Sequence, residues 1–244
     1  MKLHIADNYQ SLSEMAANEI IEMVKAKPGA ILSLAGGDTP KLTYALTAQK
    51  AREEKIDFSR ITFIALDEWV GIPPGNEGSC HFFLQQNIIE PLNLSPRQVH
   101  LFDALSPDLP NEVKKFNELI TASGGIDLML VGIGMNGHIG FNEPGASSDS
   151  YAHITPLDAF TQEVGQKYFK SATVLTQGIT LGLKHLQEAK RVILLANGTK
   201  KAFIVQQMLE GEISEELPAS IVRTHSNSLV LVDQEAASRL RADQ

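Results

Sequence analysis

The stretch IDLMLVGIGMNGHIGFNEPG, residues 126–145, joins an apolar run to a loop that contains five glycines. Its first part, 126–133, is apolar at nearly every position, which is typical of a parallel strand buried on both faces. Glycine is entropically costly, and it is used where the backbone turns tightly or approaches something closely. Asn136, His138 and Glu143 stand among the glycines. The stretch therefore predicts a buried strand that delivers a few polar groups to a closely approached site.

On both sides of this stretch, short apolar runs alternate with helical patterns. Further strands are predicted at 30–35, 61–66, 191–196 and 228–233. Helices are predicted at 11–27, 40–54, 79–89, 111–122, 200–210 and 234–241. This alternation predicts an α/β fold with an open, mostly parallel sheet and helices on both faces, of the Rossmann-like doubly wound type. No internal repeat or linker is evident, so 1–244 is interpreted as a single domain.

Two helix starts have local signatures. Ser11 and Glu14 form the pattern of a capping box. Thr39 and Pro40 have the pattern of an N-cap followed by proline at the first helical position.

Composition limits the classes of function. The net charge of −8 argues against a nucleic-acid partner. The single cysteine, Cys80, allows no intrachain disulfide and no cysteine-rich metal site. No apolar run reaches the ~18 residues of a membrane span, and the first residues lack the apolar core of a signal peptide. We therefore expect a cytoplasmic protein without a membrane partner.

Polar loops follow four of the predicted strands. They are GGDTP (36–40), DEWVG (67–71), the glycine-rich loop 132–145 and NGTKK (197–201). Ligands of open α/β sheets bind beyond the carboxyl ends of the strands, so these loops are expected to share one rim. Gly36 and Gly37 before a helix suit an anion, although a tight turn with nothing bound has the same pattern.

The candidate chemical groups each have a structural alternative. Asp67 and Glu68 suit either a helix cap or a general base with a raised pKa. His138 is either structural or a catalytic imidazole oriented by Glu143. Lys201 is either a surface charge or a phosphate ligand. The run GIGMNG matches a dinucleotide-binding pattern, but Gly140 and Pro144 break the helix that should follow, so this interpretation is rejected.

Taken together, the four loops resemble the glucosamine-6-phosphate deaminase/isomerase family over nearly the whole chain. LDEWVG resembles the family's L-D-E-[YW]-x-G strand end, and GIGMNGHIGFNEPG resembles its G-[IVL]-G-x-[ND]-G-H-[IL]-x-x-N-E-P motif. The related 6-phosphogluconolactonases share the fold and the G-x-G-x-[DN]-G-H core, but they do not carry the N-E-P-G ending. FLQQNIIEPL and GITLGLK are softer similarities to the galactosamine-6-phosphate branch.

The resemblance implies roles for particular residues. Asp67 would be the base that moves a proton between C2 and C1 of an amino sugar, and His138, supported by Glu143, would open the ring. Asn136 would orient the imidazole. The positions that match the phosphate site are Gly36, Gly37, Thr39 and Lys201, with Asp38 and Lys167 as less regular members. Neither a metal nor a nucleotide cofactor is implied.

Departures from the family pattern bear on the substrate. The glucosamine branch typically has T-G-G-T-P where this chain has AGGDTP, and its arginines after the N-E-P loop are absent. Lys167 and Gln162 stand where two of those arginines would be. The preferred substrate is therefore predicted to be galactosamine 6-phosphate, with glucosamine 6-phosphate as the alternative. A lactonase and a non-enzymatic sugar-phosphate effector domain are more remote alternatives. The short segment after 228–233 favours a monomer or small homo-oligomer.

Overall fold

The central strands form one parallel sheet, whose inner strands are apolar on both faces and need cover from both sides. A computed structural model of the chain describes residues 1–241. The sheet order is β1 (Lys2–Ala6), β10 (Ser228–Asp233), β9 (Val192–Ala196), β6 (Leu128–Gly132), β2 (Ile31–Leu34), β3 (Thr62–Ala65) and β5 (Val99–His100). Every pairing in it is parallel.

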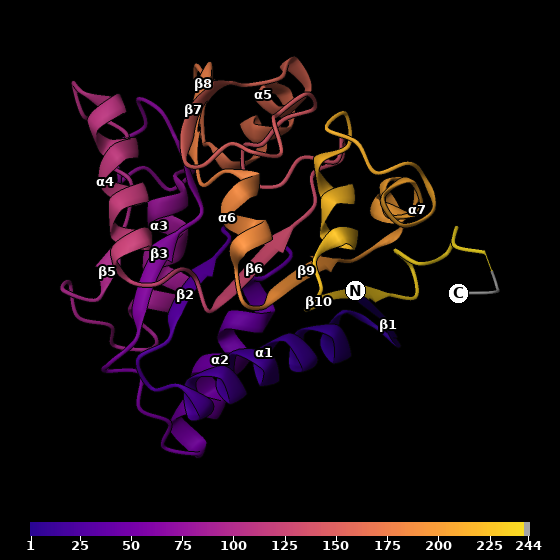
Figure 1. The fold of residues 1–244 in the computed structure, drawn as a ribbon, viewed down its shortest axis with the longest axis horizontal. Helices are drawn as coiled ribbons and strands as arrows, with labels where there is room; N and C mark the ends of the chain where they lie inside the picture. The colour runs from indigo at the N-terminus through magenta and orange to yellow at the C-terminus, as the bar shows by residue number, and fades with distance from the viewer. Residues whose placement is uncertain (242–244) are drawn as a thin grey trace.

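Helices cover the sheet on both faces (Figure 1). α1 (Tyr9–Ala26) and α2 (Lys41–Glu53) lie on one face, and α4 (Leu109–Ala122), α6 (Leu183–Glu188) and α7 (Ala202–Glu210) lie on the other. Alternation along β2 shows how the layers form. Ile31 packs in the same core as Phe116 of α4, whereas Leu32 packs in the same core as Ile20 of α1. The predicted α/β architecture is confirmed.

A second, smaller sheet stands beyond the carboxyl ends of the central strands. It is antiparallel, in the order β4 (Asp67–Trp69), β8 (Gln177–Thr180) and β7 (His153–Pro156). The ring centroids of Trp69 and Phe141 lie 4.5 Å apart in the small core beneath it. Near this sheet in the view of Figure 1 lies α5 (Ala159–Gly165), which runs into the 3₁₀ turn η2 (Gln166–Tyr168). This sheet was not predicted from the sequence.

Several shorter helical segments complete the fold. α3 (Cys80–Leu84) continues as a π-helical turn, η1 (Gln85–Ile89), so the helix predicted at 79–89 is present with a change of winding. The 3₁₀ turn η3 (Thr199–Lys201) leads into α7, and η4 (Pro218–Thr224) packs against α6 and α7.

Three local predictions are wrong. The α1 helix is capped by Asn8, whose side chain accepts a hydrogen bond from the Ser11 amide, so the Ser11 capping box does not form. α2 begins after a turn, and Pro40 occupies its cap position without a side-chain capping bond.

The predicted helix 234–241 is replaced by successive turns. The Asp233 carboxylate accepts from the Ala236 amide, while the Ser238 and Leu240 amides donate three residues back along the chain. A single four-residue bond, from the Ala237 amide to the Asp233 carbonyl, stands among these three-residue bonds, so the segment forms turns and not a continuous helix.

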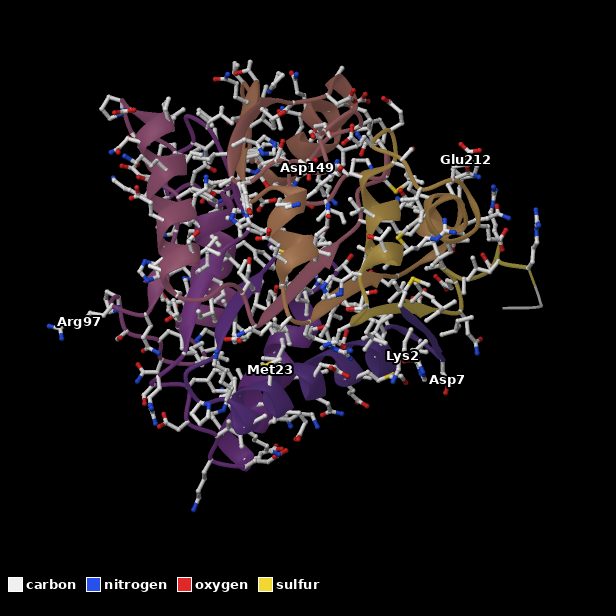
Figure 2. The ribbon with its side chains drawn as sticks, in the orientation of Figure 1. Lys2, Asp7, Met23, Arg97, Asp149 and Glu212 are labelled. Atoms are coloured by element: carbon white, nitrogen blue, oxygen red, sulfur yellow. The ribbon has the colours of Figure 1, made fainter. Side chains whose placement is uncertain are left out.

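Charged side chains lie mostly outside the two cores that flank the central sheet, as Arg97 and Glu212 do at the periphery of Figure 2. None of the helices within residues 1–241 is long and apolar enough to cross a membrane.

The chain order places a switch point in the middle of the sheet. From β2 the chain continues to β3 and β5 on one side, whereas from β6 it continues to β9 and β10 on the other. Loops that leave neighbouring strands in opposite directions open a crevice between them. The loops after β2 and β6 are the two glycine-rich segments.

Candidate active site

A cavity of about 610 Å³ opens at the carboxyl ends of β2, β3, β6 and β9. This volume lies within the usual range of small-molecule sites. All four loops predicted from the sequence contribute to its wall, and the expectation that they share one rim is confirmed. Representative lining residues are Gly37, Asp67, His138 and Lys201.

The glycines of the loop after β6 are required by close contacts. A Cβ atom at Gly134 would lie 2.5 Å from the imidazole ring of His138. Gly137 has a φ of +89°, and a Cβ there would lie 2.2 Å from the Leu217 side chain. Real Cβ atoms do not approach other atoms this closely, so a larger residue at either position would displace its neighbour. The missing side chain at Gly134 thus lets the imidazole lie directly against the main chain.

A carboxylate and an amide hold the imidazole of His138. Nδ1 of His138 lies 3.4 Å from Oε2 of Glu143, whose side chain is almost fully buried. Asn136 donates to the same carboxylate at 3.0 Å, and its Oδ1 accepts from the His138 amide at 3.3 Å. Burial raises the pKa of Glu143, but its interactions with His138, Thr161 and Asn136 outweigh burial and leave the pKa below its ordinary value. Glu143 is therefore a stable anion that can orient the ring and stabilise an imidazolium.

Thr161 is a contact that the sequence did not indicate. Its Oγ1 lies 3.3 Å from Nδ1 of His138, and it reaches the cavity from α5. The two residues are 23 apart in sequence, and no motif surrounds the threonine. Only the packing of α5 over the loop brings them together. His138 therefore presents its Nε2 side to the cavity while Glu143 and Thr161 hold the Nδ1 side.

Asp67 and Glu68 are neighbours with different surroundings. Glu68 accepts backbone hydrogen bonds from Trp69, Cys80 and His81 at 2.8, 3.0 and 2.7 Å, so it anchors the start of α3. Burial raises the pKa of Glu68, and these amides oppose that shift. The structural role predicted for one member of the pair thus belongs to Glu68.

Asp67 faces the cavity. Burial raises its pKa to about 7, the Glu68 carboxylate adds to the rise, and the Cys80 thiol opposes it. A carboxylate with this pKa is able to take up and release a proton near neutral pH, which is the requirement for a general base.

Thr180 connects β4, the strand that contains Asp67, to the glycine-rich loop. Asp67 and Thr180 are register partners in β4 and β8, and the Thr180 hydroxyl accepts from the Phe141 amide at 3.2 Å. A Cβ at Gly140 would lie 2.7 Å from that hydroxyl and 3.3 Å from the Asp67 carboxylate. The absence of a side chain at Gly140 therefore lets the base and the histidine loop approach each other.

The loop after β2 forms the opposite end of the cavity. Gly36, Gly37, Asp38 and Thr39 all line it, and Gly37 has a φ of +106°, which favours glycine. The Tyr9 hydroxyl is 3.2 Å from the Asp38 carbonyl and 2.9 Å from the Thr39 carbonyl, and it holds the loop from outside.

Three lysines line the same end: Lys167, Lys200 and Lys201. Lys201 donates to the Ile133 carbonyl, and burial lowers its pKa to about 8, with Lys167 adding to the fall and Asp38 opposing it. Lys200 was not predicted as a site residue, although it lies next to Lys201 in NGTKK. A glycine loop with three cations is suited to a phosphate group.

Lys167 is paired with Asp38, and their Nζ and Oδ2 atoms are 2.8 Å apart. Partial burial lowers the pKa of Lys167, but the hydrogen bond to Asp38 carries the pKa above its ordinary value. Gln162, the other residue at an expected arginine position, donates to the Leu157 carbonyl at 2.9 Å. This bond commits its amide nitrogen to the backbone of its own segment.

No group of three or more histidine, cysteine, aspartate or glutamate side chains in residues 1–241 is arranged to hold a metal ion.

The arrangement of a strand-end carboxylate, a glycine-held histidine and a basic glycine loop can be compared with known proteins. The sequence profile of the glucosamine-6-phosphate isomerases/6-phosphogluconolactonase family matches residues 5–231. The chain belongs to this family. A glucosamine-6-phosphate deaminase of Thermoanaerobacter sp. (strain X514) is 36% identical over 239 residues, covering 98% of this chain and 94% of the relative.

Another family member, AgaI of Escherichia coli K12, is named as a presumed deaminase and is 40% identical over 233 residues. That match covers 95% of this chain and 91% of AgaI. A solved structure described as a monomeric glucosamine-6-phosphate deaminase of the NagB superfamily is 37% identical, with a TM-score of 0.95 and coverage of 99% and 100%.

A 6-phosphogluconolactonase from Trypanosoma brucei has a TM-score of 0.77 at 19% identity, covering 98% of each chain. At this identity the similarity establishes the shared fold of the glucosamine-6-phosphate isomerase/6-phosphogluconolactonase family, and the chemistry has to be argued from the site.

Proposed function

We propose that the protein converts an amino-sugar 6-phosphate and water into a ketose 6-phosphate and ammonia. The observation that carries the proposal is that Asp67, with a pKa of about 7, and the Glu143-held His138 open onto one cavity whose other end is basic. An aldose–ketose conversion needs a base near neutral pH and a group that moves protons between oxygens. The names of the relatives support the same chemistry.

The first step opens the ring. His138 accepts the proton of the C1 hydroxyl and returns a proton to the ring oxygen, so that the bond between C1 and the ring oxygen breaks. Glu143 and Thr161 keep Nδ1 engaged, and Nε2 is left for the sugar. The imidazolium formed in passing is stabilised by the Glu143 carboxylate. The product is the open-chain aldehyde.

The second step moves a proton from C2 to C1. The Asp67 carboxylate takes the C2 proton, the electrons shift onto the C1 carbonyl oxygen, and this oxygen takes a proton given up by the C2 ammonium group, which yields an enolamine. The same carboxyl group then returns its proton to C1. The resulting imine at C2 adds water and releases ammonia, which leaves the ketose 6-phosphate. Thr180, the register partner of Asp67, keeps Asp67 beside the glycine-rich loop, and the absence of a side chain at Gly140 lets the loop approach it closely. Its pKa of about 7 suits this role, because a general base works best when its pKa lies near the ambient pH.

The phosphate is assigned to Gly36, Gly37, Thr39 and Lys201, with Lys167 and Lys200 at the same end. Backbone amides of the glycine loop and the lysines supply charge-assisted hydrogen bonds. With the phosphate at the basic end, the proposal assigns the reacting carbons to Asp67 and His138, which line the same cavity.

The favoured sugar in this proposal is galactosamine 6-phosphate, and the second candidate is glucosamine 6-phosphate. Asp38 in the glycine loop and the engagement of Gln162 with the Leu157 carbonyl support a site that differs from the glucosamine branch. The names of several relatives at 36–37% identity favour the second candidate. The two sugars differ only at C4, so discrimination depends on the hydrogen bonds of one hydroxyl.

Side-by-side kinetics with both amino-sugar phosphates, measured by ammonia release, test the proposal. We expect galactosamine 6-phosphate to have a kcat/KM roughly 5- to 150-fold higher, the cost of one unpaired polar group. A higher kcat/KM for glucosamine 6-phosphate would make the chain a glucosamine-6-phosphate deaminase. Absence of ammonia from both, with hydrolysis of 6-phosphogluconolactone, would replace the proposal with a lactonase.

A monomer is proposed as the state in solution, supported by the 0.95 TM-score to a structure described as monomeric. Light scattering of the purified protein tests this, and a mass near 26.6 kDa is expected.

A further inference from the structure

The Asp38–Lys167 ion pair lies across the basic end of the cavity. Asp38 belongs to the glycine loop after β2, and Lys167 belongs to η2, which is 129 residues further along the chain. Both side chains line the cavity, and both are well exposed, at 72% for Asp38 and 50% for Lys167. A carboxylate is thus paired with a cavity lysine next to a loop whose glycines suit an anion.

The backbone of this loop has an independent anchor. The Tyr9 hydroxyl holds the Asp38 and Thr39 carbonyls from the side of α1, and it also accepts from the Leu42 amide. The loop therefore does not depend on the ion pair for its position. Breaking the pair would release the Lys167 ammonium group and leave the loop held by Tyr9.

We propose that Asp38 competes with the substrate's phosphate for Lys167 and so weakens the binding of phosphorylated ligands. In the free protein the Asp38 carboxylate pairs with the ammonium group, and a bound phosphate takes that group from it. The inference rests on the proposed function, because it concerns the same phosphate site. The competition lowers affinity for every phosphorylated ligand, and it disfavours most the ligands that carry two negative charges, because Asp38 repels them.

The opposite role is that Asp38 holds Lys167 ready for the phosphate. The two roles predict opposite signs for the same substitution. If Asp38 competes, Asp38→Asn frees Lys167 and removes a repulsive charge, so binding becomes tighter. If Asp38 positions the lysine, the same change weakens binding.

A second ion pair supplies a matched control. Glu77 and Lys170 are 2.7 Å apart and similarly exposed, and they also join a cavity-lining loop to the segment that follows α5. Lys170 is not among the residues that line the cavity. Glu77→Gln therefore removes one negative charge near the cavity mouth and breaks a comparable pair without freeing a cavity lysine.

The experiment measures KM for the amino-sugar phosphates and, by calorimetry, the Kd of inorganic phosphate for wild type, Asp38→Asn, Glu77→Gln and Asp38→Asn/Lys167→Gln. We expect Asp38→Asn to lower both constants about 3- to 10-fold, the scale of an exposed pair plus repulsion at the surface. Glu77→Gln is expected to change them less than about twofold. The part of the gain that comes from freeing Lys167 should disappear in the double variant, which leaves at most the smaller part that comes from removing the Asp38 charge.

Three results would overturn the inference: unchanged or weaker binding by Asp38→Asn, an equal gain by Glu77→Gln, or a gain that survives the loss of Lys167 undiminished. Failure of every tested variant to bind phosphate would also overturn it. The phosphate titration requires no turnover, so it separates this inference from the proposed reaction. If no ammonia is formed but Asp38→Asn binds phosphate more tightly, the proposed reaction fails and the competition stands.

Discussion

The two ends of the cavity are built differently. At the end with Asp67 and His138, positions are fixed by packing: Glu143 is buried, and the missing Cβ atoms of Gly134 and Gly140 leave room for close contacts. At the phosphate end, a partly buried lysine, Lys201, is joined by the exposed Asp38–Lys167 pair, whose charges water can screen. Proton transfer needs fixed geometry, whereas holding a dianion mainly needs charge. Changes at the first end should therefore alter turnover, and changes at the second should alter binding.

The largest expected effect is that of Asp67→Asn. The amide keeps the shape of the side chain and loses the basic lone pair, so kcat should fall ~10²-fold or more while KM changes little. Ammonia release by the purified variant measures this, with circular dichroism as the check that the fold is intact. In the wild type, kcat/KM should rise as the pH increases through about 7, because only the ionised Asp67 is a base. Near-normal turnover by the variant would remove Asp67 from the mechanism.

The next effect is that of Lys201→Ala at the phosphate end. Loss of a charge-assisted contact should raise KM for the phosphorylated sugar roughly 10- to 150-fold, with a much smaller effect on kcat. Lys170→Ala is the control, since Lys170 is an exposed lysine outside the cavity lining. In the wild type, KM should rise above pH 8, where Lys201 loses its proton. An unchanged KM in Lys201→Ala would make this residue a structural partner of the Ile133 carbonyl only.

A smaller loss is expected for Gly134→Ala, which tests the role of packing directly. The added methyl group would lie 2.5 Å from the His138 ring and push the imidazole aside, so kcat should fall ~10- to 100-fold. Gly132→Ala is the control, because a Cβ there meets no atom within 4 Å. Equal losses in both variants would mean that the methyl group blocks the cavity and that the position of the ring is not the cause.

The smallest effect concerns stability. The pKa of Asp67 is higher in the folded protein than in the unfolded chain. As the pH rises, the unfolded chain therefore loses the Asp67 proton first, and the free energy of unfolding falls between about pH 4 and 7. Asparagine does not ionise and avoids this cost. Asp67→Asn should therefore melt about 2–6 °C above wild type at pH 8, for ~1–2 kcal/mol of relief, and show little difference at pH 4. Calorimetry at the two pH values measures it, and a difference that does not change with pH would contradict the burial of a charged Asp67.

Much of the central sheet and of the cavity with its two ends could be predicted from the sequence. The five predicted strands of the central sheet are nearly continuous apolar runs followed by polar loops, so the shared rim was evident. β1 and β5 were not predicted, because β1 mixes polar and apolar side chains and β5 has only two residues. The β4–β8–β7 sheet was not predicted either, because its strands have only three or four residues and mix polar and apolar side chains. The apolar run 61–66 continues past the end of β3 at Ala65, so the sequence did not show that a second strand, β4, begins at Asp67.

The missed site residues depend on tertiary packing. Thr161 reaches His138 from a helix that no local pattern links to the loop, and Lys200 shares its motif with Lys201 without a signal that marks it. The different roles of Asp67 and Glu68 could be distinguished only in the structure, because the amides that bind Glu68 come mainly from the start of α3.

The sheet order has a consequence for how the protein is made. β1 pairs only with β10, and residues 7–227 separate the two strands. On the ribosome, β1 therefore emerges early and has no sheet partner until the chain has been synthesised as far as Asp233, roughly 10–50 s later at ordinary rates. During that interval its open edge and those of the other strands are able to pair with other chains. The pairing of β1 with β10 is thus among the last in the sheet to become possible, and it joins the two strands of this sheet that lie farthest apart in the sequence.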